Sequence, residues 1–304
     1  MIAIPSYLLH ILIIICIYYI LAISFNLCMG YTGLPLFSQV AFFALGAYSA
    51  AIASEFGYPF LVGLLLGAVF PAFCGFLIAY PALRVRGDYF AIVTMGFAEI
   101  IGQVIHNEVW LTRGPYGISV PQPVVFGFKI DSYPTYLLLA IALTAITFIA
   151  IQRLVGSPYG RVLKATRDDE LAASVIGKHT WKYKQQVVII AALFSGVAGV
   201  YYAHYLRFVN DQPFTLAFTT IILASVILGG LGSNYGAFIG VALMLSFPEV
   251  LRVFMVSSEN VGYIQQLVIG IMLISMMLIR TKGIPISLRR RFARRGGAKN
   301  VAEN

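Results

Sequence analysis

One charged stretch, Ser157 to Gln186, holds the residues best able to do chemistry in an otherwise apolar chain. Thr166 stands three residues before Asp169, which is the spacing of a helix N-cap followed by an acidic residue at the third position. Acidic side chains in the first turn complement the helix dipole, and Gly177 is placed to end the helix. The stretch therefore predicts a helix of about two to three turns outside the membrane.

Such a short helix is marginal alone in water, so its apolar side chains are expected to dock onto another surface. A groove in a second protein is the favoured partner. The alternative is a helix that rests on the bilayer surface or on its own bundle. Because the acidic first turn, Asp168 to Glu170, disfavours anionic lipid, we expect a separate protein to act on this segment.

No pattern typical of catalysis or metal binding accompanies the charged stretch. The four histidines are scattered without a metal-ligand spacing, and the chain has neither a GxxxxGK[ST] phosphate loop nor a GxSxG elbow. The three cysteines, Cys16, Cys28 and Cys74, lie in or beside apolar runs and are expected to be small buried side chains. We therefore expect no enzyme, no metal site and no cofactor in this chain.

Glu99 is an ionisable residue about ten positions into the apolar segment 89–107, which places it near mid-depth of a spanning helix. A carboxylate facing lipid there costs several kcal/mol, so Glu99 is expected to face the bundle interior or to be protonated. One interpretation is a residue that lines or gates a pore, with Thr94 one turn earlier. The other is a hydrogen-bonded packing residue between helices, and the sequence leaves both open.

Two glycine motifs share their spacing, and each precedes an apolar segment: Gly30-Tyr-Thr-Gly33 and Gly229-Gly-Leu-Gly232. Small residues let membrane helices approach closely. Glycine-interrupted segments in two halves of a chain can also mark internal symmetry around a central path, although close packing is the commoner explanation. The glycines expected to allow close packing are Gly30, Gly33, Gly46, Gly229, Gly232 and Gly236.

The composition requires a membrane protein, with 60% hydrophobic and 11% charged residues in 304. Continuous apolar runs predict an all-α, polytopic bundle of about nine spanning helices, with eight to ten possible. The predicted spans are 7–27, 36–54, 59–80, 89–107, 135–155, 186–206, 216–232, 236–256 and 263–280. Residues 1–283 would form the membrane domain, and residues 284–304 a basic cytoplasmic tail that lies on anionic lipid headgroups.

The distribution of charge predicts the orientation. If the loop 157–186 is cytoplasmic, seventeen of the 21 Lys and Arg residues lie inside, which places the N-terminus outside and the C-terminus inside. The net charge of +9 is thus explained by topology, and we expect no nucleic-acid partner. The loop 107–134 lies outside in this arrangement and is long enough to dock a soluble partner or to cap a pore mouth.

Several motifs resemble those of bacterial binding-protein-dependent ABC importer permeases. Residues 160–177 resemble the coupling loop, with Glu170, Ala172, Ala173 and Gly177 in a loose glutamate-alanine-alanine…glycine signature from which Leu171 departs. Over residues 20–280 the chain resembles the branched-chain amino acid permeases, and most closely their M-type subunit. The segments that carry this resemblance are 30–33, 42–48, 83–94, 114–118 and 229–233.

The resemblance implies a multi-pass permease of the bacterial inner membrane, working by alternating access with two cytoplasmic ATPases that bind ATP and magnesium. It implies a second, non-identical permease and a periplasmic solute-binding protein. Arg167, Asp168, Asp169 and Glu170 would meet the ATPase groove, Gly177 would fix the helix end, and Arg84, Arg86 and Asp88 would support that surface.

Branched-chain amino acids are the solutes that the resemblance implies, whereas related permeases carry urea or short amides. Pro35, Phe37 and Gln39 depart from the run expected after Gly33, so the motifs fix the family better than the solute. Two hypotheses from other classes remain: an ion-coupled secondary carrier that depends on Glu99, and a membrane-embedded assembly protein without a path.

Overall fold

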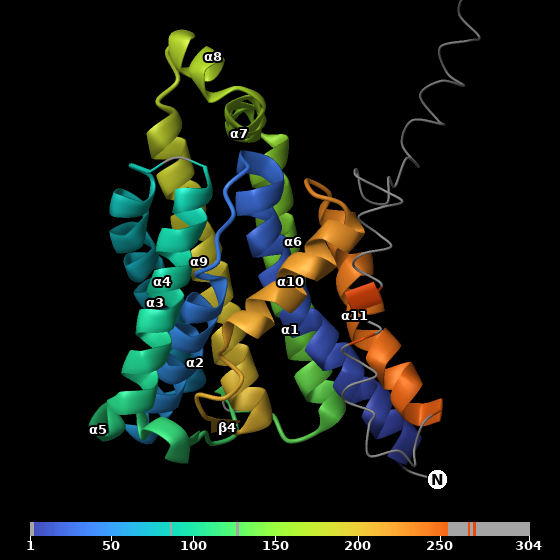
Figure 1. Ribbon diagram of the computed structural model, residues 1–304. Coiled ribbons are helices and arrows are strands. Elements are labelled where there is room, and N and C mark those ends of the chain that lie inside the picture. Colours follow the sequence, from blue (N-terminus) through green and yellow to red (C-terminus); the bar gives the residue numbers. More distant parts are fainter. Residues whose placement is uncertain (1–2, 86, 126–127, 255–266, 268–269, 272–304) are drawn as a thin grey trace, which may run out of the picture.

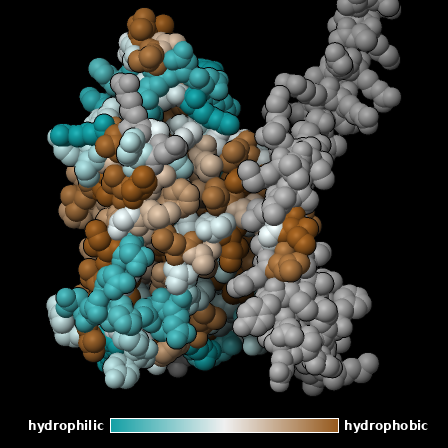
Figure 2. Space-filling view, in the orientation of Figure 1, coloured by the Kyte–Doolittle hydropathy of each residue, from teal (hydrophilic) through white to brown (hydrophobic). Residues whose placement is uncertain are grey.

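The computed structural model describes residues 3–85, 87–125, 128–254, 267, 270 and 271. Over these residues the chain is a bundle of long helices whose apolar middle is flanked by hydrophilic ends (Figures 1 and 2). The α-helices are α1 (Ala3–Thr32), α2 (Gln39–Glu55), α3 (Phe60–Ala82), α4 (Asp88–Asn107), α5 (Val109–Thr112), α6 (Tyr133–Gly156), α7 (Pro158–Asp168), α8 (Glu170–Val175), α9 (Thr180–Leu206), α10 (Leu216–Gly229) and α11 (Asn234–Phe254).

Five of these helices are long and apolar enough to cross a membrane: α1, α3, α4, α6 and α9. Two shorter apolar helices, Leu216–Gly229 and Asn234–Ser246, follow them. The protein is therefore a multi-pass helical membrane protein, as the composition predicts. Each of the first eight predicted spans falls on a helix, whereas the ninth, 263–280, lies outside the described residues apart from Leu267, Gly270 and Ile271.

The structure is not purely helical, because the predicted outer loop 107–134 contains short strands. β1 (Ile118–Ser119) pairs antiparallel with β4 (Phe208–Val209), and β2 (Val124–Val125) pairs with β3 (Phe128–Lys129). A 3₁₀ turn, Gly114–Tyr116, precedes them. The loop is thus tied to the chain that follows α9, a long-range pairing that local sequence patterns do not indicate.

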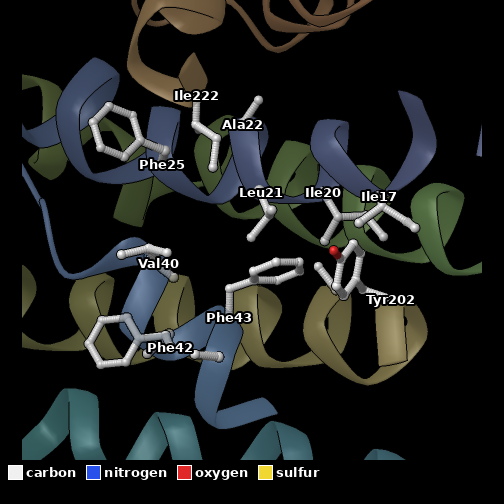
Figure 3. Close-up of a cluster of buried hydrophobic side chains, with 14 of the residues drawn as sticks. Ile17, Ile20, Leu21, Ala22, Phe25, Val40, Phe42, Phe43, Tyr202 and Ile222 are labelled. Atoms are coloured by element: carbon white, nitrogen blue, oxygen red, sulfur yellow. The ribbon is translucent and has the colours of Figure 1, made fainter. Parts of the chain in front are cut away.

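The centre of the bundle is formed by α1, α2, α9 and α10, whose large side chains interleave (Figure 3). Phe43 of α2 is fully buried and stacks on Phe218 of α10, with ring centroids 5.2 Å apart. Aromatic stacking of this kind adds to the stabilisation that burial of the rings provides. The core therefore holds α10 against the longer helices although α10 is only 14 residues long.

Glycines bring the backbones of α2, α3 and α9 together. A Cβ on Gly46 of α2 would lie 2.2 Å from the Gly196 oxygen of α9, and a Cβ on Gly196 would lie 2.0 Å from the Gly67 oxygen of α3. In the same way, a Cβ on Gly229 or Gly236 would overlap the other residue's carbonyl, which pairs α10 with α11. These approaches are closer than any other residue allows.

Gln39, one of the residues that depart from the family run, is fully buried in this core. Its Nε2 donates to the hydroxyl of Ser24 on α1 and to that of Ser195 on α9, at 2.6 Å in both cases. The side chain therefore links three helices in this conformation.

Candidate coupling site

The charged stretch forms two helices at one end of the bundle, shown at the top of Figure 1, and the predicted single helix with Thr166 as its N-cap is wrong. α7 starts at Pro158, because proline suits the first turn of a helix. Thr166 lies in the last turn of α7, where its hydroxyl donates to the Val162 oxygen at 2.9 Å. A threonine bonded within a helix cannot cap the next one.

Asp169 separates the two helices and caps the second. Its backbone is extended, with φ of −155°, and its Oδ1 accepts a hydrogen bond from the Ala172 N–H at 3.0 Å. At the other end of α8, the N–H groups of Gly177 and Lys178 donate to the oxygens of Ser174 and Ala173. Gly177 has φ of +77°, a conformation that glycine adopts without strain. The short helix is therefore fixed at both ends by its own residues.

α8 presents apolar side chains to the surroundings at the tip of the molecule (Figures 1 and 2). Leu171, Val175 and Ile176 are 69%, 86% and 71% exposed. Ala172 is also exposed, whereas Ala173 is buried between α8 and α9. We call Leu171, Val175 and Ile176 the apolar tip.

An ion pair anchors the start of α8 to α9. The Glu170 carboxylate lies 2.6 Å from the Lys184 ammonium, whose side chain is only 15% exposed. Glu170 is thus engaged within the chain, whereas Asp168 lies exposed at the end of α7. The position of the apolar tip therefore depends on a contact that movement of α8 relative to α9 would change.

A cavity of about 670 Å³ opens beside α8, between α7, the segment after α1 and the segment after α3. Gly33, Arg84, Arg167, Asp168 and Glu170 are among its lining residues. Arg84 lies over the ring of Tyr80, 4.3 Å from its centroid. Arg86 and the side chain of Asp88 lie outside the described part of the chain.

The two glycine motifs lie against each other beneath α7. A Cβ on Gly30 would lie 2.5 Å from the Gly232 nitrogen, and Gly33 has φ of +72°. Gly30 lies within the last turns of α1 instead of preceding a helix. The motifs thus form one junction between the end of α1 and the turn from α10 to α11.

Glu99 is exposed on α4, and its role as a pore-lining or a packing residue stays a prediction. Its carboxylate accepts a hydrogen bond from the Gln103 amide at 3.2 Å. It lines a cavity of about 280 Å³ with Gly102, Gln103, His106, Asp211, Thr215 and four apolar residues, Val40, Ala98, Phe214 and Leu216. The carboxylate therefore borders a small space of mixed polarity between α4 and the start of α10.

Thr94 is buried and differs from Glu99 in its surroundings. Its hydroxyl accepts a hydrogen bond from the Phe37 N–H at 3.2 Å and lies 3.0 Å from the Phe90 oxygen, to which it donates. The geometry is that of an anchor for the segment between α1 and α2. A role for Thr94 in a pore stays a prediction.

The family of the chain follows from comparison with known proteins. Residues 7–277 match the family described as "Branched-chain amino acid transport system / permease component". The chain belongs to this family. The permease protein LivM of Salmonella typhimurium is 32% identical over 293 residues, which cover 88% of this chain and 67% of the relative.

More distant relatives include both named permease types. A probable LivM of Methanocaldococcus jannaschii is 24% identical over 275 residues, covering 78% of this chain and 79% of the relative. The permease protein LivH of Escherichia coli is 24% identical over 284 residues, covering 88% of this chain and 90% of the relative. No solved structure matches the chain. The predicted membership of the branched-chain permeases is confirmed, and the family is one of transport subunits, not enzymes.

The permease also contains polar contacts that the sequence did not indicate. His106 at the end of α4 pairs with Asp211, their atoms 2.6 Å apart, and Asn26 of α1 bonds to Asn234 of α11 at 3.1 Å. Both pairs join residues more than 100 positions apart. Among the described residues, no group of three or more His, Cys, Asp or Glu side chains could hold a metal ion.

Proposed function

We propose that the chain is a permease subunit of an ABC importer, forming the path by which branched-chain amino acids cross the bacterial inner membrane. Two cytoplasmic ATPases, which bind ATP and magnesium, drive alternating access. A second permease and a periplasmic solute-binding protein complete the importer, and this chain itself carries no cofactor. The names of the LivM and LivH relatives support both the solute and the presence of two permease types.

The apolar tip is the observation that carries this proposal. Three apolar side chains stand exposed on a short helix surrounded by hydrophilic residues, at an end of the bundle that would lie in water (Figure 2). Each such side chain contributes about 1.5–3 kcal/mol when it is fully buried. A groove in an ATPase would bury them together, and Asp168 would meet the rim of that groove.

The opposite end of the bundle suits the binding protein. α5 lies at the end of the bundle far from α8 (Figure 1). Trp110 of α5 and Tyr116, both in the predicted outer loop, are exposed. α1 begins at that end, which accords with an external N-terminus. We assign this end to the periplasm and the α7–α8 end to the cytoplasm, following the excess of Lys and Arg on the latter side.

The solute path runs beside α4. Glu99 lies in a spanning helix, is exposed, and borders a cavity that also has apolar walls. A carboxylate in this place needs a polar environment, which a water-containing path or the second permease would provide. A path with few charges suits a zwitterionic solute with an apolar side chain.

Val175→Glu tests the coupling assignment. A carboxylate at the apolar tip is expected to lower ATP-dependent uptake of labelled leucine by about tenfold or more, because a charge cannot enter an apolar groove without cost. The measurement is uptake into proteoliposomes that contain the whole importer, with co-purification of the ATPase as a second readout. Val109→Glu, at the opposite end, is the matched control and should keep the ATPase bound.

Normal uptake and normal ATPase binding by Val175→Glu would show that α8 is not the coupling element. Glu170→Arg is also expected to abolish transport while membrane insertion persists. It is the less specific variant, because it places a second cation beside Lys184. Competition with labelled leucine identifies the solute. Unlabelled isoleucine and valine should lower its uptake, whereas urea and short amides should not.

Exposed Glu99 favours one other function, an ion-coupled secondary carrier. That function predicts uptake by the purified chain alone when an ion or proton gradient is applied, with Glu99 essential. The importer function predicts no uptake without the partner proteins and ATP.

A further inference from the structure

The end of α1 is capped by a side chain from the coupling segment. The Arg167 Nη1 donates a hydrogen bond to the Gly30 oxygen, across 137 positions of sequence. Neighbouring carbonyls of α1 are satisfied by the following backbone, since the N–H groups of Gly33 and Leu34 donate to the oxygens of Met29 and Cys28. Arg167 thus supplies a donor for a carbonyl at the end of a helix, where a cation is also favoured by the helix dipole.

The same side chain touches both glycine motifs. Its Cγ lies 3.4 Å from where a Cβ on Gly33 would stand, and its Nη1 lies 3.4 Å from where a Cβ on Gly232 would stand. Both glycines have positive φ, +72° and +80°. The arginine therefore lies in van der Waals range of both motifs, at two positions whose backbone favours glycine.

Behind the arginine, hydrogen bonds through side-chain amides connect α1 with two further helices, α6 and α11. The Gly232 N–H donates to Asn26 Oδ1 at 2.9 Å, and Asn26 Nδ2 donates to Asn234 Oδ1 at 3.1 Å. Asn234 Nδ2 then donates to Gln152 Oε1 of α6 at 2.9 Å. Asn26 and Asn234 are almost fully buried, so the bond between them has no competition from water, whereas Gln152 is exposed.

We infer that Arg167 is the link through which displacement of α7 and α8 reaches the junction of α1, α6, α10 and α11. The inference rests on the proposed function, and it assigns the Arg167 guanidinium to the Gly30 oxygen of the permease and not to the ATPase groove. Arg167 is a positioning residue in this role, since it acts through the helices that it joins.

α7 has a second contact with the end of α1 that does not involve the Arg167 side chain. The Lys164 ammonium lies 5.7 Å from the centroid of the Tyr31 ring. This contact, together with the Glu170–Lys184 pair, holds the coupling segment in place when Arg167 is shortened. Removing the Arg167 side chain should therefore break transmission without releasing α7 or the ATPase.

The experiment compares Arg167→Ala with Arg161→Ala in the complete importer in proteoliposomes. Arg161 lies on the same helix, and among the described residues its guanidinium makes no hydrogen bond or ion pair. Uptake, ATP hydrolysis and ATPase co-purification are measured for both. For Arg167→Ala we expect normal co-purification and hydrolysis but about tenfold less leucine per ATP, the effect of losing a charge-assisted hydrogen bond. Arg161→Ala should match the wild type.

Arg167→Lys keeps a cation within reach of the Gly30 oxygen and should recover part of the coupling ratio. Loss of the ATPase from Arg167→Ala would overturn the inference, because it would place the arginine in the groove. An unchanged coupling ratio would overturn it as well. If Arg167→Ala does not accumulate in the membrane, Arg167→Gln serves in its place. Full coupling by Arg167→Gln would also overturn the inference. Absence of ATP-dependent uptake in the wild type would instead refute the proposed function.

Discussion

α3 and α4 are neighbours in the bundle, and they differ in the residues that they expose (Figure 1). α3 turns small residues inward, including Gly63, Gly67 and Gly75, and exposes large apolar side chains such as Val69 and Phe73. α4 differs on its exposed side. That side carries large apolar residues such as Ile92 and Ile100, and also a stripe of glycine and polar residues. The stripe consists of Gly96, Glu99, Gln103 and His106.

The difference separates a lipid-facing helix from one that needs another neighbour. An outer surface of Val and Phe suits hydrocarbon, and the inner glycines of α3 bring its backbone close to α9. On α4, no heavy atom of the described residues lies within 4 Å of a Cβ placed on Gly96 or Gly102. Because Glu99 is also unsuited to lipid, the α4 stripe fits the solute path or the second permease.

The largest expected effect comes from filling the glycine contact between α3 and α9. Gly196→Ala places a Cβ about 2.0 Å from the Gly67 oxygen, and a backbone atom cannot rotate away. Overpacking of this kind costs about 1–3 kcal/mol or more. The free energy of unfolding, measured by denaturation in detergent, should fall by that amount.

Gly96→Ala on α4 is the matched substitution and should have the opposite sign. Its Cβ enters open space, and alanine is favoured over glycine in a helix by up to about 1 kcal/mol. Equal destabilisation by both variants would mean that the outer side of α4 is already covered by this chain, which would remove the contrast between the two helices.

The next effect is on transport. Glu99→Gln removes the charge of the α4 stripe while keeping its size and its hydrogen-bond acceptor. We expect leucine uptake by the importer to fall by about tenfold, because a hydrogen bond to a charged acceptor is stronger than one to a neutral acceptor. The amount of permease in the membrane should be unchanged or slightly higher, because a neutral side chain inserts more easily.

Phe73→Leu on α3 is the control for Glu99→Gln and should leave uptake near the wild-type value. Full activity of Glu99→Gln would identify Glu99 as a packing residue, the alternative that the sequence left open. Combined measurement of uptake and of membrane content separates a transport defect from a folding defect.

The sequence predicted features that depend on neighbouring residues. Asp169 and Gly177 fix the ends of α8 through bonds within a few positions, and the end at Gly177 was expected where it lies. The start at Thr166 was wrong because Pro158 begins an earlier helix, so that Thr166 falls inside α7. Local patterns identify capping residues, but the choice between two possible caps depends on how much of the chain is already helical.

Contacts between distant residues could not be predicted in this way. Asn26 and Asn234 are 208 positions apart, and the sequence around either residue does not indicate that the two are in contact. The surroundings of Glu99 could not be predicted for a related reason, since they depend on how α4 rotates against α2 and α3. One available signal was the spacing of Gly96, Glu99, Gln103 and His106, which places all four on one side of a helix.

The smallest expected effect tests the lipid-facing side of the comparison. Phe73→Trp enlarges a side chain that is 55% exposed on the apolar face of α3. Lipid chains can move aside for it, and surface substitutions of this kind stay within about 0.5 kcal/mol, or roughly a twofold change. Uptake and membrane content should therefore remain near the wild-type values.

Gly96→Trp on α4 is expected to lower uptake and co-purification of the second permease more than Phe73→Trp, because a neighbouring helix cannot move aside as lipid does. The reverse order would show that α3, not α4, meets the second permease, since only a close protein surface makes a position intolerant of added volume.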